Sequence, residues 1–276
     1  MDFLPWCTHF HGPPANLRVA QPGVRVVQPV VVFASSMISV RNLIKTYRRG
    51  SEKVVACRVD QLDIAAGEQV ALIGRSGSGK STLLNILAGV LLPDGGDVEV
   101  DGVPVTSLSE RARDRFRGER IGMVFQTFNL LQPFNALENV LLGAVFAHHA
   151  DAATKARATS LLQRVGLGER LHHRPSELSV GQAQRVALCR ALVNEPRLIL
   201  ADEPLGNQDK ATGLEALGLL LDLARERGST VVMVTHDSDS ARLMQRTVDL
   251  HELRPASGGC SPSVCATYGC ASCRPR

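Results

Sequence analysis

The sequence predicts an α/β fold that combines a mainly parallel core sheet, an antiparallel β subdomain and a helical subdomain near residues 127–180. Two observations lead to this prediction. Short apolar runs at 69–73, 121–125, 198–201 and 230–234 are typical of buried strands, and helical patterns alternate with them. In addition, a glycine-rich loop separates the first of these strands from a helix.

Length and composition set limits on the class of protein. A chain of 276 residues can hold one large domain or two small ones, and its hydrophobic content of 44% is that of a soluble globular protein. The net charge of +4 is too weak to indicate nucleic-acid binding. We find no apolar run long enough to cross a bilayer, so a membrane role would require a partner. The seven cysteines do not form the framework of a secreted protein.

The two ends of the chain differ from its middle. Residues 1–36 are rich in Pro and Val without periodicity, so we expect a disordered extension or a start codon placed upstream of Met37. A globular domain is expected over 37–253. Residues 254–276 are expected to form a disordered, Cys-rich tail. The alternative for the tail is a zinc site, because four cysteines have suitable spacings: Cys260, Cys265, Cys270 and Cys273.

The antiparallel region is expected early in the globular domain. Residues 38–41 alternate like an edge strand, residues 54–62 supply a second strand, and residues 97–100 supply a third. Tyr47 lies between the first two strands beside basic residues, and by itself it is typical of a half-buried surface position.

A phosphate-binding loop follows the strand at 69–73 and opens a helix at 81–88. Its glycines allow a tight backbone whose N–H groups point at an anion, and the helix N-terminus adds partial positive charge. In this pattern Lys80 bridges the β- and γ-phosphates and Ser81 holds Mg²⁺. The flanking strand and helix argue against a merely flexible loop, so the sequence predicts nucleoside triphosphate binding. The loop residues are Gly74, Arg75, Ser76, Gly77, Ser78, Gly79, Lys80, Ser81 and Thr82.

Further candidate residues stand where other apolar strands end. Asp202 and Glu203 close the strand that begins at 198, so one carboxylate can hold Mg²⁺ through water while the other polarises the attacking water. His236 follows the strand at 230–234. An isolated histidine there is more often structural, but the chemistry at the neighbouring strand ends favours a functional role.

Two other stretches have two interpretations each. A helix is expected over 183–193, and it is preceded by Ser179, Gly181 and Gln182. These residues could form a second anion site or could simply cap the helix N-terminus, and capping alone is the more common case. Residues 127–143 carry many large apolar side chains, which indicates either helical core or a docking face.

Taken in order, these motifs resemble the ATPase subunit of ATP-binding-cassette (ABC) transporters over residues 37–253. The stretches 125–131 and 135–140, and less specifically 230–237, are most similar to the lipoprotein-release, macrolide-efflux and cell-division branch. The residues that carry the resemblance are Tyr47, the phosphate loop, Gln126, the pentapeptide 178–182, Asp202, Glu203, Asp209 and His236.

The resemblance implies a role for each matching residue. Tyr47 would stack on adenine, and Gln126 would sense the metal and the lytic water while contacting the membrane partner. Asp202 would hold Mg²⁺ through water, Glu203 would be the general base, and His236 would contact the γ-phosphate. Two further groups would complete the site in a head-to-tail homodimer: Ser179, Gly181 and Gln182, closing over the other subunit's ATP, and Asp209 at the dimer interface.

The resemblance also implies ATP and Mg²⁺ as cofactors and a membrane permease as partner, with no nucleic acid and no membrane span in this chain. The protein would be cytoplasmic, held at the inner face of the membrane by the permease.

The family pattern is not complete, because Val180 replaces the usual Gly, Leu205 the usual Thr, and Gln208 the usual Leu. A β-branched residue fits poorly if position 180 needs a positive φ. Residues 248–253 begin like the family's final strand, but the expected Asp-Gly turn is missing.

Two alternative functions remain at this point. The substitutions near the expected dimer interface are compatible with a regulatory partner that binds ATP but hydrolyses it slowly. A soluble cassette ATPase acting on DNA or ribosomes would be expected to carry a coiled-coil insertion or paired cassettes, and the chain has neither. The cargo cannot be predicted, because it is selected by the permease.

Overall fold

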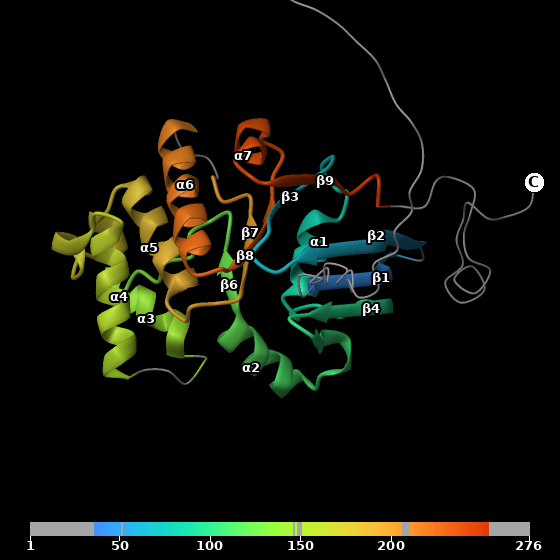
Figure 1. Ribbon diagram of the computed structural model, residues 1–276, viewed down its shortest axis with the longest axis horizontal. Helices are drawn as coiled ribbons and strands as arrows, with labels where there is room; N and C mark the ends of the chain where they lie inside the picture. Colours follow the sequence, from blue (N-terminus) through green and yellow to red (C-terminus); the bar gives the residue numbers. More distant parts are fainter. Residues whose placement is uncertain (1–35, 51, 146, 148–150, 206–209, 254–276) are drawn as a thin grey trace, which may run out of the picture. The chain divides into compact units, whose positions relative to one another are not determined.

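The computed structural model describes most of the chain between residues 36 and 253, and it shows a layered α/β arrangement (Figure 1). The predicted N-terminal extension and Cys-rich tail lie outside the described residues, apart from Ser36. The described ranges are 36–50, 52–145, 147, 151–205 and 210–253.

The core sheet is parallel, as predicted. It contains β3 (Gln69–Ile73), β6 (Ile121–Val124), β7 (Leu198–Asp202), β8 (Thr230–Val234) and β9 (Arg246–Asp249), in the spatial order β6-β7-β8-β3-β9. All four neighbouring pairs are parallel, so the carboxyl ends of these strands meet at one edge of the sheet. Loops that follow β3, β6, β7 and β8 are thereby brought together.

Successive residues of each core strand contribute to two different hydrophobic cores, because strand side chains alternate between faces. Val231 and Met233 belong to the core beneath one group of helices, whereas Val232 belongs to the opposite core. The helices of the first group are α3 (Ala136–Val145), α4 (Ala152–Arg164), α5 (Val180–Leu192) and α6 (Lys210–Glu226). On the opposite face, α1 (Lys80–Leu87) lies between the core sheet and the second sheet (Figure 1).

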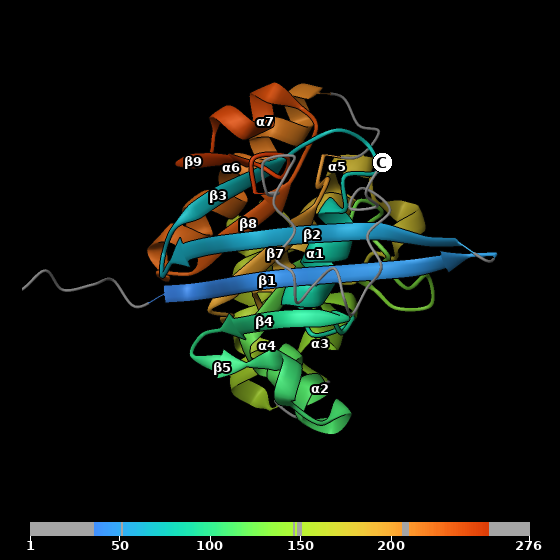
Figure 2. The same cartoon turned by 90° about the vertical axis from the view of Figure 1, so that its right-hand side faces the viewer.

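The second sheet is antiparallel and corrects one expectation. It consists of β1 (Ser36–Arg49), β2 (Glu52–Ala65), β4 (Gly95–Val100) and β5 (Val103–Pro104), in the order β2-β1-β4-β5 (Figure 2). The expectation that 38–41 is an edge strand is wrong, because β4 returns to pair with β1 and places Val40 opposite Val98. Alternation reflects one buried and one exposed face, which an interior strand of such a sheet shares with an edge strand.

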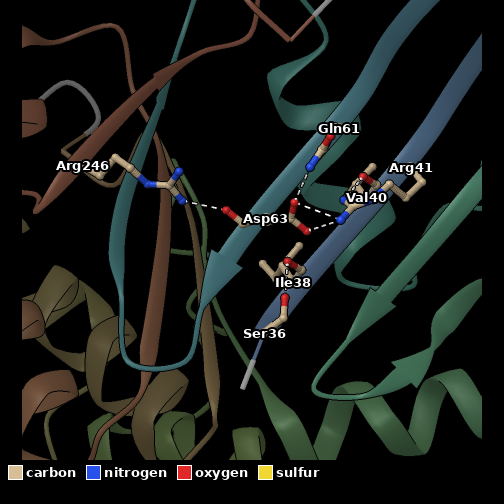
Figure 3. Close-up of polar contacts among 7 residues, drawn as sticks. All are labelled: Ser36, Ile38, Val40, Arg41, Gln61, Asp63 and Arg246. Atoms are coloured by element: carbon tan, nitrogen blue, oxygen red, sulfur yellow. Dashed lines mark hydrogen bonds and ion pairs between the residues drawn. The ribbon is translucent and has the colours of Figure 1, made fainter. Parts of the chain in front are cut away.

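Polar side chains reinforce the pairing of β1 with β2 and connect the second sheet to the first (Figure 3). Arg41 binds both carboxylate oxygens of Asp63, at 2.7 and 2.9 Å, and Gln61 donates to the same carboxylate. Arg246 of β9 donates to the backbone oxygen of Asp63 at 2.8 Å and pairs with Glu68. A strand of the parallel sheet is therefore fixed to the turn that follows β2.

The remaining helices have clear capping signals. Ser109 caps α2 (Glu110–Arg120), and Asp237 caps the short α7 (Ser238–Arg242). Short 3₁₀ turns lie at Val105–Ser107, Gly168–Arg170 and Pro175–Glu177. Among the described residues, none of the helices combines the length and the apolar character that a membrane crossing requires.

The helical subdomain is present, and it separates the two interpretations of 127–143. Residues from Ala136 onward form α3, whose Leu137 and Val140 are buried in the core. The preceding loop keeps Leu131 and Phe134 exposed, at 48% and 37%. The second half of the apolar stretch thus contributes to the core, whereas the first half exposes Leu131 and Phe134 and packs only Leu130 against that core.

Candidate functional site

The phosphate loop joins β3 to α1, and its backbone requires glycine. Gly79 has φ = 93°, and an added Cβ would collide with the carbonyl oxygen of Ala56 on β2. At Gly74, where φ is 152°, a Cβ would lie 2.9 Å from the Oγ atom of Ser78. A side chain at either position would distort the loop, because L-residues rarely adopt these conformations and the space is occupied.

Lys80 is buried at the start of α1, with only 7% of its surface exposed. Its Nζ atom donates to the carbonyl oxygens of Gly74 at 2.9 Å and Arg75 at 3.1 Å. No carboxylate of the described residues forms an ion pair with it. The two carbonyl groups use two of the three N–H donors of an ammonium, which leaves the third for an anion.

Ser81 and Asp202 lie together where β7 ends. The Ser81 hydroxyl donates to the Asp202 carboxylate at 3.2 Å. Burial raises the pKa of Asp202, the neighbouring Glu203 charge adds to this, and the Ser81 hydrogen bond and Lys80 oppose it. A hydroxyl and a partly buried carboxylate are hard oxygen ligands of the kind Mg²⁺ prefers, so the residues present fit that ion.

Glu203 and His236 bring the ends of β7 and β8 into contact. The Nδ1 atom of His236 lies 2.9 Å from the Oε1 atom of Glu203. Glu203 has φ = 44°, a strained conformation for a residue with a side chain, and its backbone N–H donates to Val234 at 2.9 Å. Strain of this kind costs of order 1–3 kcal/mol and is often found at functional sites.

Lys80, Ser81, Glu203 and His236 line one cavity of about 780 Å³, whereas Asp202 is not among its lining residues. Its walls include the phosphate loop, Glu203 and His236, which join residues more than 100 positions apart in the sequence. One wall was missed by sequence reasoning: it is formed by Val54, Val55 and Ala56 of β2. The sequence signal for this wall was the pair of adjacent valines, Val54 and Val55, in a strand. In the structure both side chains are more than 40% exposed.

Tyr47 lies beside this wall rather than in it. It is on β1, directly opposite Val54, and is 48% exposed. Lys45 places its Nζ atom 5.9 Å from the centre of the Tyr47 ring. Tyr47 is not among the residues that line the cavity, so its adenine contact remains a prediction.

Gln126 follows β6 at the same edge of the sheet. Its side chain is exposed, and it does not line the phosphate cavity. The segment after it is held from α5, because Arg190 donates to the carbonyl oxygens of Phe128 at 2.6 Å and Asn129 at 2.7 Å. The structure therefore connects the segment that follows Gln126 to α5.

Ser179, Gly181 and Gln182 begin α5 and lie outside the phosphate cavity of this chain. Ser179 and Gln182 form a capping box, with bonds of 3.3 and 2.9 Å, so the N-capping interpretation is confirmed. Helix α5 starts at Val180, three residues earlier than expected, and Val180 has no positive φ. The concern about a β-branched residue at this position therefore does not apply.

The other residues expected at a dimer interface are only partly described. Gly181 packs closely against α6, since a Cβ there would lie 2.8 Å from the Cγ2 atom of Thr212 and would force a local shift. Leu205 packs against the helical core. Gln208 and Asp209 lie outside the described residues, so their predicted positions stay predictions.

The chain is similar to known proteins over most of its length. Residues 58–206 match the family described as ABC transporter. The chain is 45% identical to the lipoprotein-releasing system ATP-binding protein LolD of Pseudomonas fluorescens over 217 residues, which cover 79% of this chain and 96% of that protein. It is also 45% identical to the macrolide export ATP-binding/permease protein MacB of Escherichia coli over 226 residues, 81% of this chain but 35% of that protein.

A solved structure shows the same fold. The dimeric post-hydrolysis state of the ATP-binding cassette MJ0796, bound to ADP and Pi, superposes with a TM-score of 0.70. It is 40% identical to this chain, and the match covers 77% of this chain and 94% of that one.

Proposed function

The chain belongs to the ABC transporter family as an ATP-binding and ATP-hydrolysing subunit, and from this premise we propose a role for each residue of its phosphate cavity. One observation carries the proposal. Lys80, Glu203 and His236 lie on the segments that follow three neighbouring strands, β3, β7 and β8, and all of them line the same cavity.

The phosphate loop and Lys80 bind the triphosphate. Lys80 is already fixed by two carbonyl groups, so its remaining N–H can reach the β- and γ-phosphates without a further loss of side-chain freedom. Ser81 and Asp202 are the residues that would hold Mg²⁺. That ion would neutralise charge on the phosphate oxygens.

Glu203 accepts the proton of the attacking water. Its backbone is fixed by the bond to Val234, and His236 holds its carboxylate from the other side. Because both ends of Glu203 are restrained, its free oxygen can be aimed at a water next to the γ-phosphate. His236 is 73% exposed, so its ring can also contact that phosphate.

A second copy of the chain completes each site. Ser179 and Gly181 begin α5 away from the phosphate cavity of their own chain, as expected if they close over the ATP of a partner. The dimeric cassette similar to this chain supports this arrangement. Gln182 fixes the Ser179 backbone, and Asp209 would lie at the same interface.

We further propose that ATP hydrolysis drives a separate membrane permease, with the complex at the inner face of the membrane. The 45% identity to both LolD and MacB favours a transporter of the lipoprotein-release or macrolide-export type. The exposed Leu131 and Phe134 support docking through the loop after Gln126, where Phe128 and Leu130 also lie.

Glu203→Gln tests the catalytic assignment. The amide keeps the shape but loses the charge, so hydrolysis should fall by ~10²–10⁴-fold, the usual contribution of a general base. ATP binding should persist, and a Mg-ATP dimer should accumulate in size-exclusion chromatography. Lys80→Ala is the matched control, which should lose ATP and dimer together. A Glu203→Gln variant with the parent rate would remove Glu203 from the mechanism.

A further inference from the structure

The backbone of Glu203 is strained, and neighbouring groups restrain it from more than one side. Its φ of 44° is sparsely populated by residues with a side chain, and such a conformation persists only where the surroundings enforce it. The Glu203 N–H donates to the carbonyl oxygen of Val234 at 2.9 Å, and the Glu203 carboxylate meets the Nδ1 atom of His236 at 2.9 Å. A further restraint acts on the residue that follows, Pro204.

Gln184 of α5 supplies this restraint. Its Nε2 atom donates to the carbonyl oxygen of Pro204 at 2.9 Å, and both residues are buried. Because the proline ring already fixes φ at Pro204, a bond to its carbonyl oxygen also fixes the direction in which the chain leaves Glu203. Gln184 is only 2% exposed, so water does not compete for this hydrogen bond.

The other end of the Gln184 amide gains nothing from its position. Within the described ranges, its Oε1 atom is buried without a hydrogen-bond partner. A buried acceptor that is left unpaired lowers stability. Reversing the amide would not help, because its oxygen would then face the carbonyl oxygen of Pro204. A side chain that is unfavourable in this way is expected where function requires the bond that its other end makes.

Gln184 also connects Glu203 to the end of α5 that the proposed dimer uses. It lies five residues after Ser179, about 8 Å along the helix axis. Helices α5 and α6 lie side by side (Figure 1), and Leu205, which follows Pro204, packs against the core that they share. A movement of α5 would therefore be transmitted to the segment that carries Glu203.

We propose that Gln184 is a positioning residue for ATP hydrolysis, which holds the general base Glu203 in its strained conformation through the carbonyl group of Pro204. The inference rests on the proposed function and adds to it a residue that acts through Glu203. It has a consequence for the dimer. Since α5 would close over the ATP of the partner, closure over one ATP would set the base that acts on the other.

Gln184→Met removes the N–H donor while keeping the length of the side chain. It also removes the unpaired Oε1 atom, so the thermal midpoint of unfolding should stay close to that of the parent. The kcat of the full chain for ATP hydrolysis should fall by roughly 10²-fold, the effect expected when a catalytic group is misplaced by about 1 Å. The Kd for ATP should be unchanged, because Lys80 and the phosphate loop are intact.

Gln69→Met is the matched control. Gln69 is also buried and donates from Nε2 to a backbone carbonyl, that of Leu221, at 2.9 Å. It begins β3, at the opposite edge of the sheet from the phosphate loop. Its Oε1 atom accepts from Arg225 at 3.4 Å, so this variant loses two hydrogen bonds. It should be less stable than the parent and yet hydrolyse ATP at the parent rate. If Gln184 were only structural, Gln184→Met would also keep the parent rate.

A double-mutant cycle tests whether Gln184 acts through Glu203. Gln184→Met combined with Glu203→Gln should be no slower than Glu203→Gln alone, because the group that Gln184 positions is then already disabled. Two effects that multiply would show that Gln184 acts elsewhere and would overturn the inference. Gln184→Asn is a second variant, whose amide is one methylene too short to reach Pro204, and it should show the same loss of rate.

The remaining outcomes separate the inference from the proposed function. Parent rates in Gln184→Met and Gln184→Asn would overturn the inference, and so would failure of both variants to fold, since Gln184 would then be needed for the structure itself. In either case an inactive Glu203→Gln would leave the proposed function intact. If Glu203→Gln kept the parent rate, the proposed function itself would be wrong.

Discussion

Gly79 shows how strongly one residue can constrain the site. Its φ of 93° and its approach to the Ala56 carbonyl leave no room for a side chain where the phosphate loop becomes α1. The same approach brings β2 against the loop, so that Val55 and Ala56 face the cavity. A conformational requirement of one glycine thus determines which strand forms the wall of the nucleotide site.

We expect Gly79→Ala to lose ATP binding and to lower the thermal midpoint of unfolding. A left-handed conformation alone costs an L-residue about 1–2 kcal/mol, and the collision with Ala56 adds to this. Gly102→Ala is the control, because Gly102 has φ = 73° but a Cβ there would meet nothing within 4 Å. Differential scanning fluorimetry without nucleotide compares them. Equal losses in the two variants would show that the collision contributes nothing.

Two elements connect the chemistry to the rest of the molecule. Helix α5 is capped by Ser179, its buried Gln184 donates to the carbonyl oxygen of Pro204 at 2.9 Å, and its Arg190 reaches the loop after Gln126. Helix α7 follows His236 directly and is held by its N-cap, Asp237. Each element therefore connects a candidate site residue to a neighbouring loop.

The N-cap of α7 should make stability depend on pH. Hydrogen bonds from Ser240 lower the pKa of Asp237 from 3.8 to about 2, with Lys210 contributing attraction. Because the pKa of Asp237 is lower in the folded state, its carboxylate stabilises the folded protein. This stabilisation is complete above pH 4 and is lost as the pH falls towards 2. Asp237→Asn should therefore be less stable than the parent at pH 6, and the difference should shrink below pH 4 and disappear only below pH 2. Urea titrations at several pH values measure this, and a constant difference would contradict the assignment.

At the scale of the whole molecule, the parallel sheet gathers the phosphate loop, Asp202, Glu203 and His236 at one edge, while Ser179 begins a helix elsewhere. The site as described within one chain lacks the second anion-binding element that the family pattern requires. Two copies arranged head to tail would supply it.

Mixing two inactive variants tests this arrangement. Lys80→Ala should lack ATP binding, and Ser179→Arg should block closure over a partner's ATP, so each alone should hydrolyse little ATP. In mixed dimers one site combines an intact Lys80 with an intact Ser179, and hydrolysis should reappear in the mixture. The unmixed variants at the same total concentration are the controls. A mixture no more active than either variant would argue against a shared site.

The sequence alone determined the parallel core, the phosphate loop and the residues at the strand ends. These features depend on local signals: apolar runs of strand length, glycines at fixed spacing, and carboxylates directly after a strand. The strand limits at Gln69–Ile73 and Thr230–Val234 agree with the structure without adjustment. The roles of the individual site residues, and the ends of the chain outside 36–253, stay predictions.

Only the tertiary structure decided what depends on contacts between distant segments. It placed β1 inside its sheet, because β4 returns to pair with it. It brought Val54 and Val55 to the cavity wall through the approach of β2 to Gly79, and it connected Arg190 to the loop after Gln126. In each case the partner lies tens of residues away, and local propensity contains no information about which distant backbone or carbonyl a side chain will meet.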